Sequence, residues 1–259
     1  MSHELEGHHA LICGASRGIG RATAARLSEM GARTTLLARD GEALEALAHE
    51  LKERGGDSRA LVADLESPAL AETLRAHLSA HGGVDIVIHN TGGPPAGPLR
   101  EATTQDLMVA FRRHVISAQT IQQATLPHMK ERGYGRFIQV LSTSVKEPIP
   151  NLGVSNIIRA AMASWAKSLS RELPPGITIN NILPGFTDTD RLSSLKEAVA
   201  ARTGQSHDAV LKGWIDQVPE GRLASPDETA AAIAFLAGPE AGYIRGVSLA
   251  VDGGRTRSI

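Results

Sequence analysis

The chain has 259 residues, and its 27 Lys and Arg nearly balance its 28 Asp and Glu, so no global positive field would attract nucleic acid or an anionic membrane. The single cysteine, Cys13, excludes an internal disulfide framework and is typical of a reducing compartment. The first residues lack the pattern of a secretory signal, and no apolar run reaches the roughly 20 residues that span a bilayer, so we expect a cytoplasmic protein.

Short apolar runs alternate with longer segments of helical period, which predicts repeated strand–helix units. The expected strands are, in chain order, His9–Cys13, Thr34–Ala38, Ala60–Ala63, Val84–Ile88, Arg136–Leu141, Ile177–Leu183 and Val247–Val251. The expected helices are Ile19–Met30, a helix capped by Asp40 and running to Arg54, a helix with Pro68 in its first turn, Thr104–Lys130, Leu152–Leu173 and Pro226–Ala237. We expect Pro127 to end or bend the long fourth helix, because proline removes a helical hydrogen bond.

This alternation predicts an α/β fold, with one doubly wound Rossmann-type domain over residues 1–259. Its parallel sheet of seven strands would carry helices on both faces. A polar helical insertion at about Asp190–Gln217 is expected on the substrate side of this domain, together with the loop Gly93–Arg100. Substrate identity is expected to depend on these two segments.

Three glycines, Gly14, Gly18 and Gly20, separate the first strand from the first helix. Because glycine has no Cβ, the backbone can approach a pyrophosphate closely, and the free N–H groups and dipole of the helix start attract its charge. The same glycines would also suit a plain strand-to-helix connection. Their place between a strand and a helix favours the dinucleotide site.

With four later segments, this glycine loop resembles the short-chain dehydrogenase/reductase family, in the manner of 3-oxoacyl-acyl-carrier-protein reductases. The later segments are Asp64–Leu65, His89–Gly92, Pro184–Thr189 and Val251–Gly254. Cys13 departs from the family pattern, which has Thr there. The resemblance implies that a cofactor is bound by Gly14, Ser16, Arg17, Gly18, Ile19, Gly20, Arg39, Asp64, Leu65, Asn90, Gly92, Arg159, Pro184, Gly185, Thr187 and Thr189. It also implies a homotetramer or homodimer packed through the two long helices.

Two features bear on the choice of dinucleotide. Asp40 lies 20 residues after Gly20, which favours the ribose hydroxyl of NAD. The second strand ends at Ala38, however, where NAD-dependent members of the family carry their acid. Arg39 and Arg17 match positions that hold the 2′-phosphate in NADP-dependent members, and guanidinium groups suit phosphate. We therefore expect NADP(H), with Asp40 serving as a helix cap.

The family places a catalytic Ser after the fifth strand and a Tyr-x-x-x-Lys motif on the following helix. The resemblance puts Ser142 at the serine position, Ser155 at the Tyr position and Arg159 at the Lys position. His114 falls where the family has a supporting Asn. The only tyrosines, at positions 134 and 243, are not followed by a lysine four residues later.

These residues change the expected proton chemistry. A serine hydroxyl is far less acidic than a phenol, whose pKa is near 10, so Ser155 is a poor proton donor. Arg159 stays charged and could bind ribose hydroxyls, while Ser142 could orient the substrate. His114 and Lys146 are alternative donors, since imidazole titrates near neutral pH. Ser155 and Arg159 would equally fit an ordinary polar stripe on an amphipathic helix.

Two functions remain open at this point. The first is an NADP(H)-dependent oxidoreductase that acts on a small carbonyl or alcohol with atypical proton delivery, or on a carbon–carbon double bond. The second is a dinucleotide-binding sensor, scaffold or inactive subunit. No metal is expected, because His77 and His81 form a pair without a third ligand and are interpreted as solvent-facing.

Overall fold

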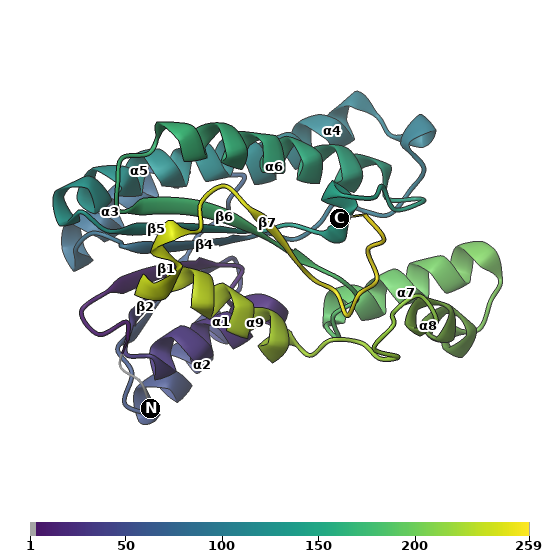
Figure 1. Ribbon diagram of the computed structural model, residues 1–259, viewed down its shortest axis with the longest axis horizontal. Helices are drawn as coiled ribbons and strands as arrows, with labels where there is room; N and C mark the ends of the chain where they lie inside the picture. Colours follow the sequence, from purple (N-terminus) through teal and green to yellow (C-terminus); the bar gives the residue numbers. More distant parts are fainter. Residues whose placement is uncertain (1–3, 259) are drawn as a thin grey trace.

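A computed structural model describes residues 4–258, which form one seven-stranded parallel sheet between two layers of helices (Figure 1). The strands are β1 (His9–Cys13), β2 (Arg33–Ala38), β3 (Ser58–Val62), β4 (Ile86–Asn90), β5 (Gly135–Val140), β6 (Ile177–Pro184) and β7 (Ser248–Val251). Their order is β3-β2-β1-β4-β5-β6-β7, with every neighbouring pair parallel. The chain order reverses between β1 and β4, and ligands bind at such switch points in doubly wound sheets.

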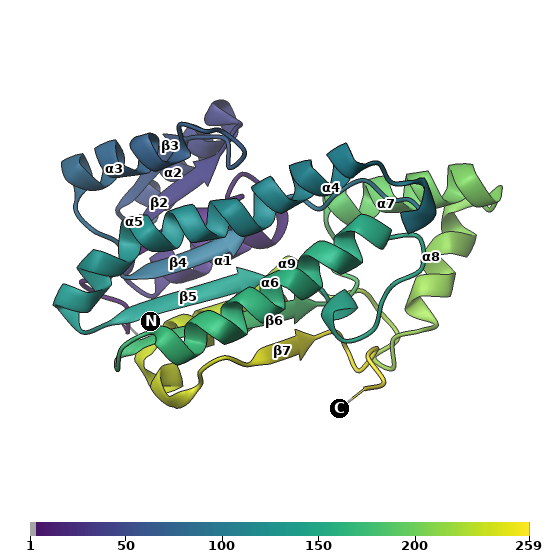
Figure 2. The same cartoon turned by 90° about the horizontal axis from the view of Figure 1, so that it is seen from above.

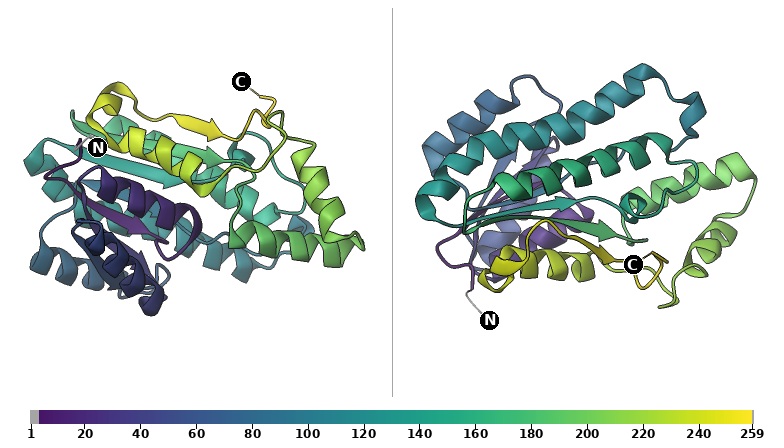
Figure 3. Two further views of the ribbon diagram at one scale, coloured as in Figure 1. Left: turned by 90° about the horizontal axis from the view of Figure 1, so that it is seen from below. Right: turned by 45° about the horizontal axis from the view of Figure 1, so that its top comes forward.

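Helices cover both faces of the sheet (Figure 3). They are α1 (Gly18–Glu29), α2 (Gly41–Glu53), α3 (Leu70–His81), α4 (Thr104–Phe111), α5 (Ser117–Arg132), α6 (Gly153–Glu172), α7 (Asp190–Thr203), α8 (His207–Ile215) and α9 (Pro226–Ala237). One layer holds α1, α2 and α9, and the other holds α3, α5 and α6 (Figure 1). Figure 2 shows α7 and α8 beyond the carboxyl ends of the strands. The expected fold class is confirmed.

The apolar strands feed two cores, because successive side chains of a strand point to opposite faces. On β1, Ala10 and Ile12 join the core under α1, α2 and α9, while Leu11 and Cys13 join the core under α3, α5 and α6. Burial on both faces explains why this strand is an unbroken apolar run in the sequence. No helix among residues 4–258 is both long and apolar enough to cross a bilayer.

The expected helix Thr104–Lys130 is two helices, α4 and α5, joined by a π-helical turn at Arg112–Ile116. Pro127 lies inside α5, which continues to Arg132 and ends at Gly133 with a left-handed φ of 65°. Of the two alternatives expected for Pro127, that it ends the helix is wrong, while a bend remains a prediction. Burial of residues on both sides of the proline, such as Met129, outweighs the one helical hydrogen bond that it removes.

The expected insertion forms two helices, α7 and α8, rather than one polar stretch. Gly204, with a left-handed φ of 71°, ends α7, and the Ser206 hydroxyl accepts from the Ala209 N–H to begin α8. His77 and His81 are also not simply solvent-facing: their rings lie 4.7 Å apart, and His77 contacts the Thr35 hydroxyl. The described residues contain no cluster of three or more His, Cys, Asp or Glu placed to hold a metal.

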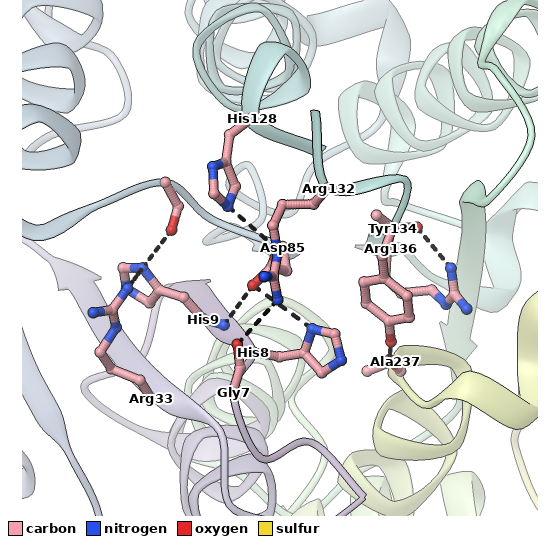
Figure 4. Close-up of polar contacts among 12 residues, drawn as sticks. Gly7, His8, His9, Arg33, Asp85, His128, Arg132, Tyr134, Arg136 and Ala237 are labelled. Atoms are coloured by element: carbon pink, nitrogen blue, oxygen red, sulfur yellow. Dashed lines mark hydrogen bonds and ion pairs between the residues drawn. The ribbon is translucent and has the colours of Figure 1, made fainter. Parts of the chain in front are cut away.

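A polar cluster surrounds Asp85 at the amino ends of the strands, opposite the cavity described below (Figure 4). The buried Asp85 carboxylate accepts from the His9 backbone N–H at 2.9 Å. Its other oxygen lies 3.3 Å from His128 Nε2 and 3.5 Å from Arg132 Nε. The cluster joins β1, the start of β4 and the end of α5, so we assign it a structural role.

Candidate active site

A cavity of about 910 Å³ opens at the carboxyl ends of the strands, over the switch point between β1 and β4. It is lined by all the expected site residues except Gly20 and His114. These lining residues are Gly14, Ser16, Arg17, Gly18, Ile19, Arg39, Asp64, Leu65, Asn90, Gly92, Ser142, Ser155, Arg159, Pro184, Gly185, Thr187 and Thr189. Segments from most of the chain thus meet at one cavity.

The glycine loop at the start of α1 has the geometry of an anion site. Gly14 and Gly18 have left-handed φ angles of 62° and 54°, which favour glycine. A Cβ on Gly20 would lie 2.1 Å from the Gly14 carbonyl oxygen, so Gly20 lets the helix approach the strand. The N-cap residue Arg17 makes no side-chain cap bond within residues 4–258, which leaves the first N–H groups of α1 open to a ligand. These features fit a pyrophosphate.

The end of β2 presents a positive surface to the cavity. Asp40 is used as the cap of α2, where its carboxylate accepts from the Ala43 N–H at 3.1 Å, as expected. Arg39 is exposed beside it, and Arg17, which also lines the cavity, makes a long, exposed contact of 3.9 Å to Asp190. Of the arginines that line the cavity, Arg17 and Arg39 are the two that the sequence indicated for a ribose phosphate.

Ser142, Ser155 and Arg159 lie on the inner wall of the cavity. The Ser142 hydroxyl oxygen accepts from the Ser144 N–H at 3.1 Å, so the hydroxyl hydrogen of Ser142 is not used in this bond and can be donated to another acceptor. Arg159 is 7% exposed and donates from Nη1 to the Val140 carbonyl at 2.8 Å. Burial, aided by the Arg191 charge, lowers the pKa of Arg159 to about 10, so the guanidinium is still charged at neutral pH.

His114 is not among the residues that line the cavity. It lies buried on the π-helical turn, with Nδ1 2.5 Å from the Thr91 hydroxyl oxygen. Burial, and then the charge of Arg159, lower the pKa of His114 far below its usual range, so the ring is neutral. The expectation that His114 itself protonates a substrate therefore lacks support in this geometry, since Thr91 stands between the ring and the cavity. Lys146, the other alternative donor, is exposed.

Several lining residues escaped sequence reasoning. Arg191 follows Thr189 by two residues, and its place just after the segment Pro184–Thr189 was the available signal. Phe186 and Trp214 stack with ring centroids 5.2 Å apart, and the Arg255 guanidinium lies 4.6 Å over Phe186. No local pattern joins these three residues, because they meet only when α8 and the C-terminal segment fold over β6. The stacked rings of Phe186 and Trp214 form an aromatic wall of the cavity.

Comparison with known proteins identifies relatives along nearly the full chain. The family model described as Enoyl-(Acyl carrier protein) reductase matches residues 14–256. The 3-oxoacyl-(acyl-carrier-protein) reductase FabG of Vibrio cholerae is 34% identical over 253 residues, which cover 96% of this chain and 98% of that protein. The 2,3-dihydroxy-2,3-dihydro-p-cumate dehydrogenase of Pseudomonas putida is 30% identical, covering 97% and 95%.

Solved structures share the fold over the same extent. L-sorbose reductase from Gluconobacter frateurii, complexed with NADPH and L-sorbose, superposes with a TM-score of 0.93 at 28% identity and full coverage of both chains. YwfH, an NADPH-dependent reductase involved in bacilysin biosynthesis, gives a TM-score of 0.91 at 28% identity and covers 97% of this chain and 99% of that one.

Proposed function

Because this chain belongs to the short-chain dehydrogenase/reductase family, we propose that it is an NADPH-dependent reductase of a small carbonyl compound whose proton does not come from a tyrosine. One observation carries this proposal: both tyrosines lie away from the cavity. The Tyr134 hydroxyl donates to the Ala237 carbonyl at 2.6 Å, at the edge shown in Figure 4, and Tyr243 is fully exposed. Ser155 takes the place of the family's tyrosine in this proposal, and Arg159 that of its lysine.

NADPH is the coenzyme that the residues of the cavity suit. The open N–H groups at the start of α1 would hold the pyrophosphate, and Arg17 and Arg39 would hold the 2′-phosphate. Arg159 would face the nicotinamide ribose. The coenzyme supplies a hydride when bound, and the chain supplies binding and electrostatics. The L-sorbose reductase and YwfH, both linked to NADPH, support this assignment.

The side chains of Ser142, Ser155 and Arg159 would stabilise negative charge on the substrate, and none of them can donate a phenolic proton. As a carbonyl gains a hydride at carbon, its oxygen becomes negative. The Ser142 and Ser155 hydroxyls can donate hydrogen bonds to that oxygen, and Arg159 supplies a fixed positive charge. Water would then provide the proton that completes the alcohol. A conjugated substrate would need a less effective proton donor, because the enolate it forms is a weaker base than an alkoxide.

A second function is favoured by the same missing phenol. The chain would then bind the dinucleotide with little turnover, as a sensor, scaffold or inactive subunit. Binding of NADPH without its oxidation by any member of a panel of ketones and enones would support this second function. Turnover of any panel member would exclude it.

The decisive experiment restores the family's pair in the double variant Ser155→Tyr with Arg159→Lys. We expect ketone reduction, followed by NADPH absorbance, to rise about 10²-fold or more, the usual contribution of a placed acid. The control pairs Ser155→Phe with Arg159→Lys, which adds the ring without its hydroxyl. Equal activities of the two variants, with equal melting temperatures, would contradict the proposal that the natural chain lacks an effective proton donor.

We also propose the homodimer or homotetramer that the family resemblance implies. Large apolar side chains are exposed on α4, the π-helical turn and α6: Met108, Phe111, Ile116 and Ile157. A second copy packed on these helices would bury them. Sedimentation of a Phe111→Asp variant as a smaller species than the natural chain would support the arrangement.

A further inference from the structure

Two guanidinium groups approach the same point of the cavity from different elements. Arg159 comes from α6, and Arg191 comes from the first turn of α7. A methyl group built on Gly93, in the loop after β4, would lie 3.3 Å from Nη2 of Arg191 and 3.7 Å from Nη2 of Arg159. Gly93 does not have a left-handed φ, so its backbone does not require glycine. The missing side chain instead leaves room in front of both groups.

Neither guanidinium group is neutralised by the protein. Arg159 donates to the Val140 carbonyl and Arg191 to the Pro94 carbonyl at 2.7 Å, and both acceptors are uncharged. Among residues 4–258, no ion pair links either group to a carboxylate. The nearby Glu66 is already paired with Arg113.

Two like charges at the wall of a cavity are costly unless an anion joins them, especially when one is buried. Arg159 is nine-tenths buried, and its Nε has no hydrogen-bond partner among the described atoms. The phosphates of the proposed coenzyme already have partners in the start of α1, Arg17 and Arg39. The arginine pair beside Gly93 therefore has no anionic partner in the coenzyme-binding arrangement proposed above.

We propose that Arg159 and Arg191 together bind the carboxylate of an anionic substrate, such as a 2-oxo acid, next to the reacting carbonyl. This inference rests on the proposed function and names the substrate class of the same site. A carboxylate suits two planar guanidinium groups, because each can donate paired hydrogen bonds to its oxygens. The aromatic wall of Phe186 and Trp214 offers an apolar surface in the same cavity for the rest of the substrate.

The first test measures binding without turnover. Benzoylformate, its neutral methyl ester and pyruvate are titrated by calorimetry into the protein saturated with NADP⁺, and again without coenzyme. We expect the acids to bind and the ester to bind at least about 10-fold more weakly. Absence of binding by both acids, or equal binding of benzoylformate and its ester, would overturn the proposal.

The second test removes one charge with Arg191→Met, because Arg191 is exposed enough to replace without emptying the core. We expect a loss of about 10- to 100-fold in benzoylformate affinity, and in kcat/KM where turnover occurs, with little change for the ester. Arg191→Lys keeps the charge and should recover part of the loss. Lys196→Met, on the same helix but outside the cavity lining, serves as the matched control.

The NADPH dissociation constant of each variant distinguishes the two sources of an anion. If Arg191→Met weakens the binding of NADPH and leaves the affinity for benzoylformate unchanged, the arginine pair binds a coenzyme phosphate. The proposal is then overturned. Failure of the natural chain to bind NADPH would refute the proposed function. The titrations without coenzyme would then still decide whether the pair binds a carboxylate.

Discussion

Arg39 and Asp40 are neighbours after β2, yet their different partners give them different consequences for coenzyme binding. The Asp40 carboxylate accepts from the Ala43 N–H and is therefore committed to the start of α2. Arg39 remains exposed at the cavity. A 2′-phosphate would thus meet a cation, whereas a 2′-hydroxyl would find its nearest acid already engaged in capping.

This contrast leads to a prediction for Arg39→Ala. We expect the NADPH dissociation constant to rise about 10- to 100-fold, because a charge-assisted hydrogen bond to phosphate is lost. The NADH dissociation constant should change little, since NADH lacks that phosphate. Fluorescence titration of both nucleotides measures the two values. Arg75→Ala, on the exposed face of α3, is the control, and an equal loss for NADH and NADPH would contradict the assignment.

At the scale of elements, the junction of β1 and α1 depends on how closely a helix can approach a strand. Gly20 is buried and faces the Gly14 carbonyl, and the Asn90 side chain donates to that same carbonyl at 3.4 Å. The loop, the first helix and the end of β4 are therefore held as one unit. Anion binding requires this unit, because it directs the N–H groups of α1 toward the cavity.

We expect Gly20→Ala to lower the melting temperature and to weaken NADPH binding together. The added Cβ would lie 2.1 Å from a backbone oxygen, which cannot move without opening the loop. Gly213→Ala is the matched control, because nothing lies within 4 Å of its Cβ position on α8. That control should stabilise the chain by about 0.5–1 kcal/mol, as alanine does in helices. Thermal unfolding and NADPH titration of both variants test the pair.

For the whole molecule, the neighbouring central strands β1 and β4 hold buried histidines, His9 and His89, that are neutral in the folded state. Burial, and then the nearby Arg33 charge, lower the pKa of His9 from 6.5 to about 4. Burial, followed by Arg159, lowers the pKa of His89 to about 3. His9 lies beside the Asp85 cluster of Figure 4, with its Nδ1 2.8 Å from the Gly83 carbonyl and its Nε2 2.8 Å from the Thr35 hydroxyl.

These lowered values predict acid sensitivity. The unfolded chain binds protons at these histidines below about pH 6.5, while the folded chain does not until much lower pH. The free energy of unfolding should therefore fall as the pH drops from about 6.5 toward 4, by up to about 1.4 kcal/mol per pH unit for His9 alone. Above about pH 6.5 this contribution is fully present.

The measurement is urea unfolding of His9→Gln at several pH values in this window. The variant keeps a polar side chain but removes the titration, so its stability should depend less steeply on pH. The corresponding change at His49, which is exposed on α2, provides the control. An unchanged pH slope in His9→Gln would contradict the assignment.

The sequence by itself determined the features that act over a few residues. The alternation of apolar strands and amphipathic helices specified the doubly wound sheet, since burial on both faces requires continuous apolar strands. The glycines from Gly14 to Gly20 and the cap Asp40 were readable because loop conformation and capping depend on neighbours in the chain. The site residues that the motifs and the family resemblance indicated all line the cavity except Gly20 and His114.

Only the tertiary structure decided how distant side chains meet. It placed His114 behind Thr91 through a π-helical turn, and it brought His77 of α3 into contact with the Thr35 hydroxyl of β2. It also brought the guanidinium groups of Arg159 and Arg191 together in front of Gly93. Distances between segments that are far apart in sequence depend on the packing of whole layers. No local pattern encodes them, and burial then sets the charge state of each group.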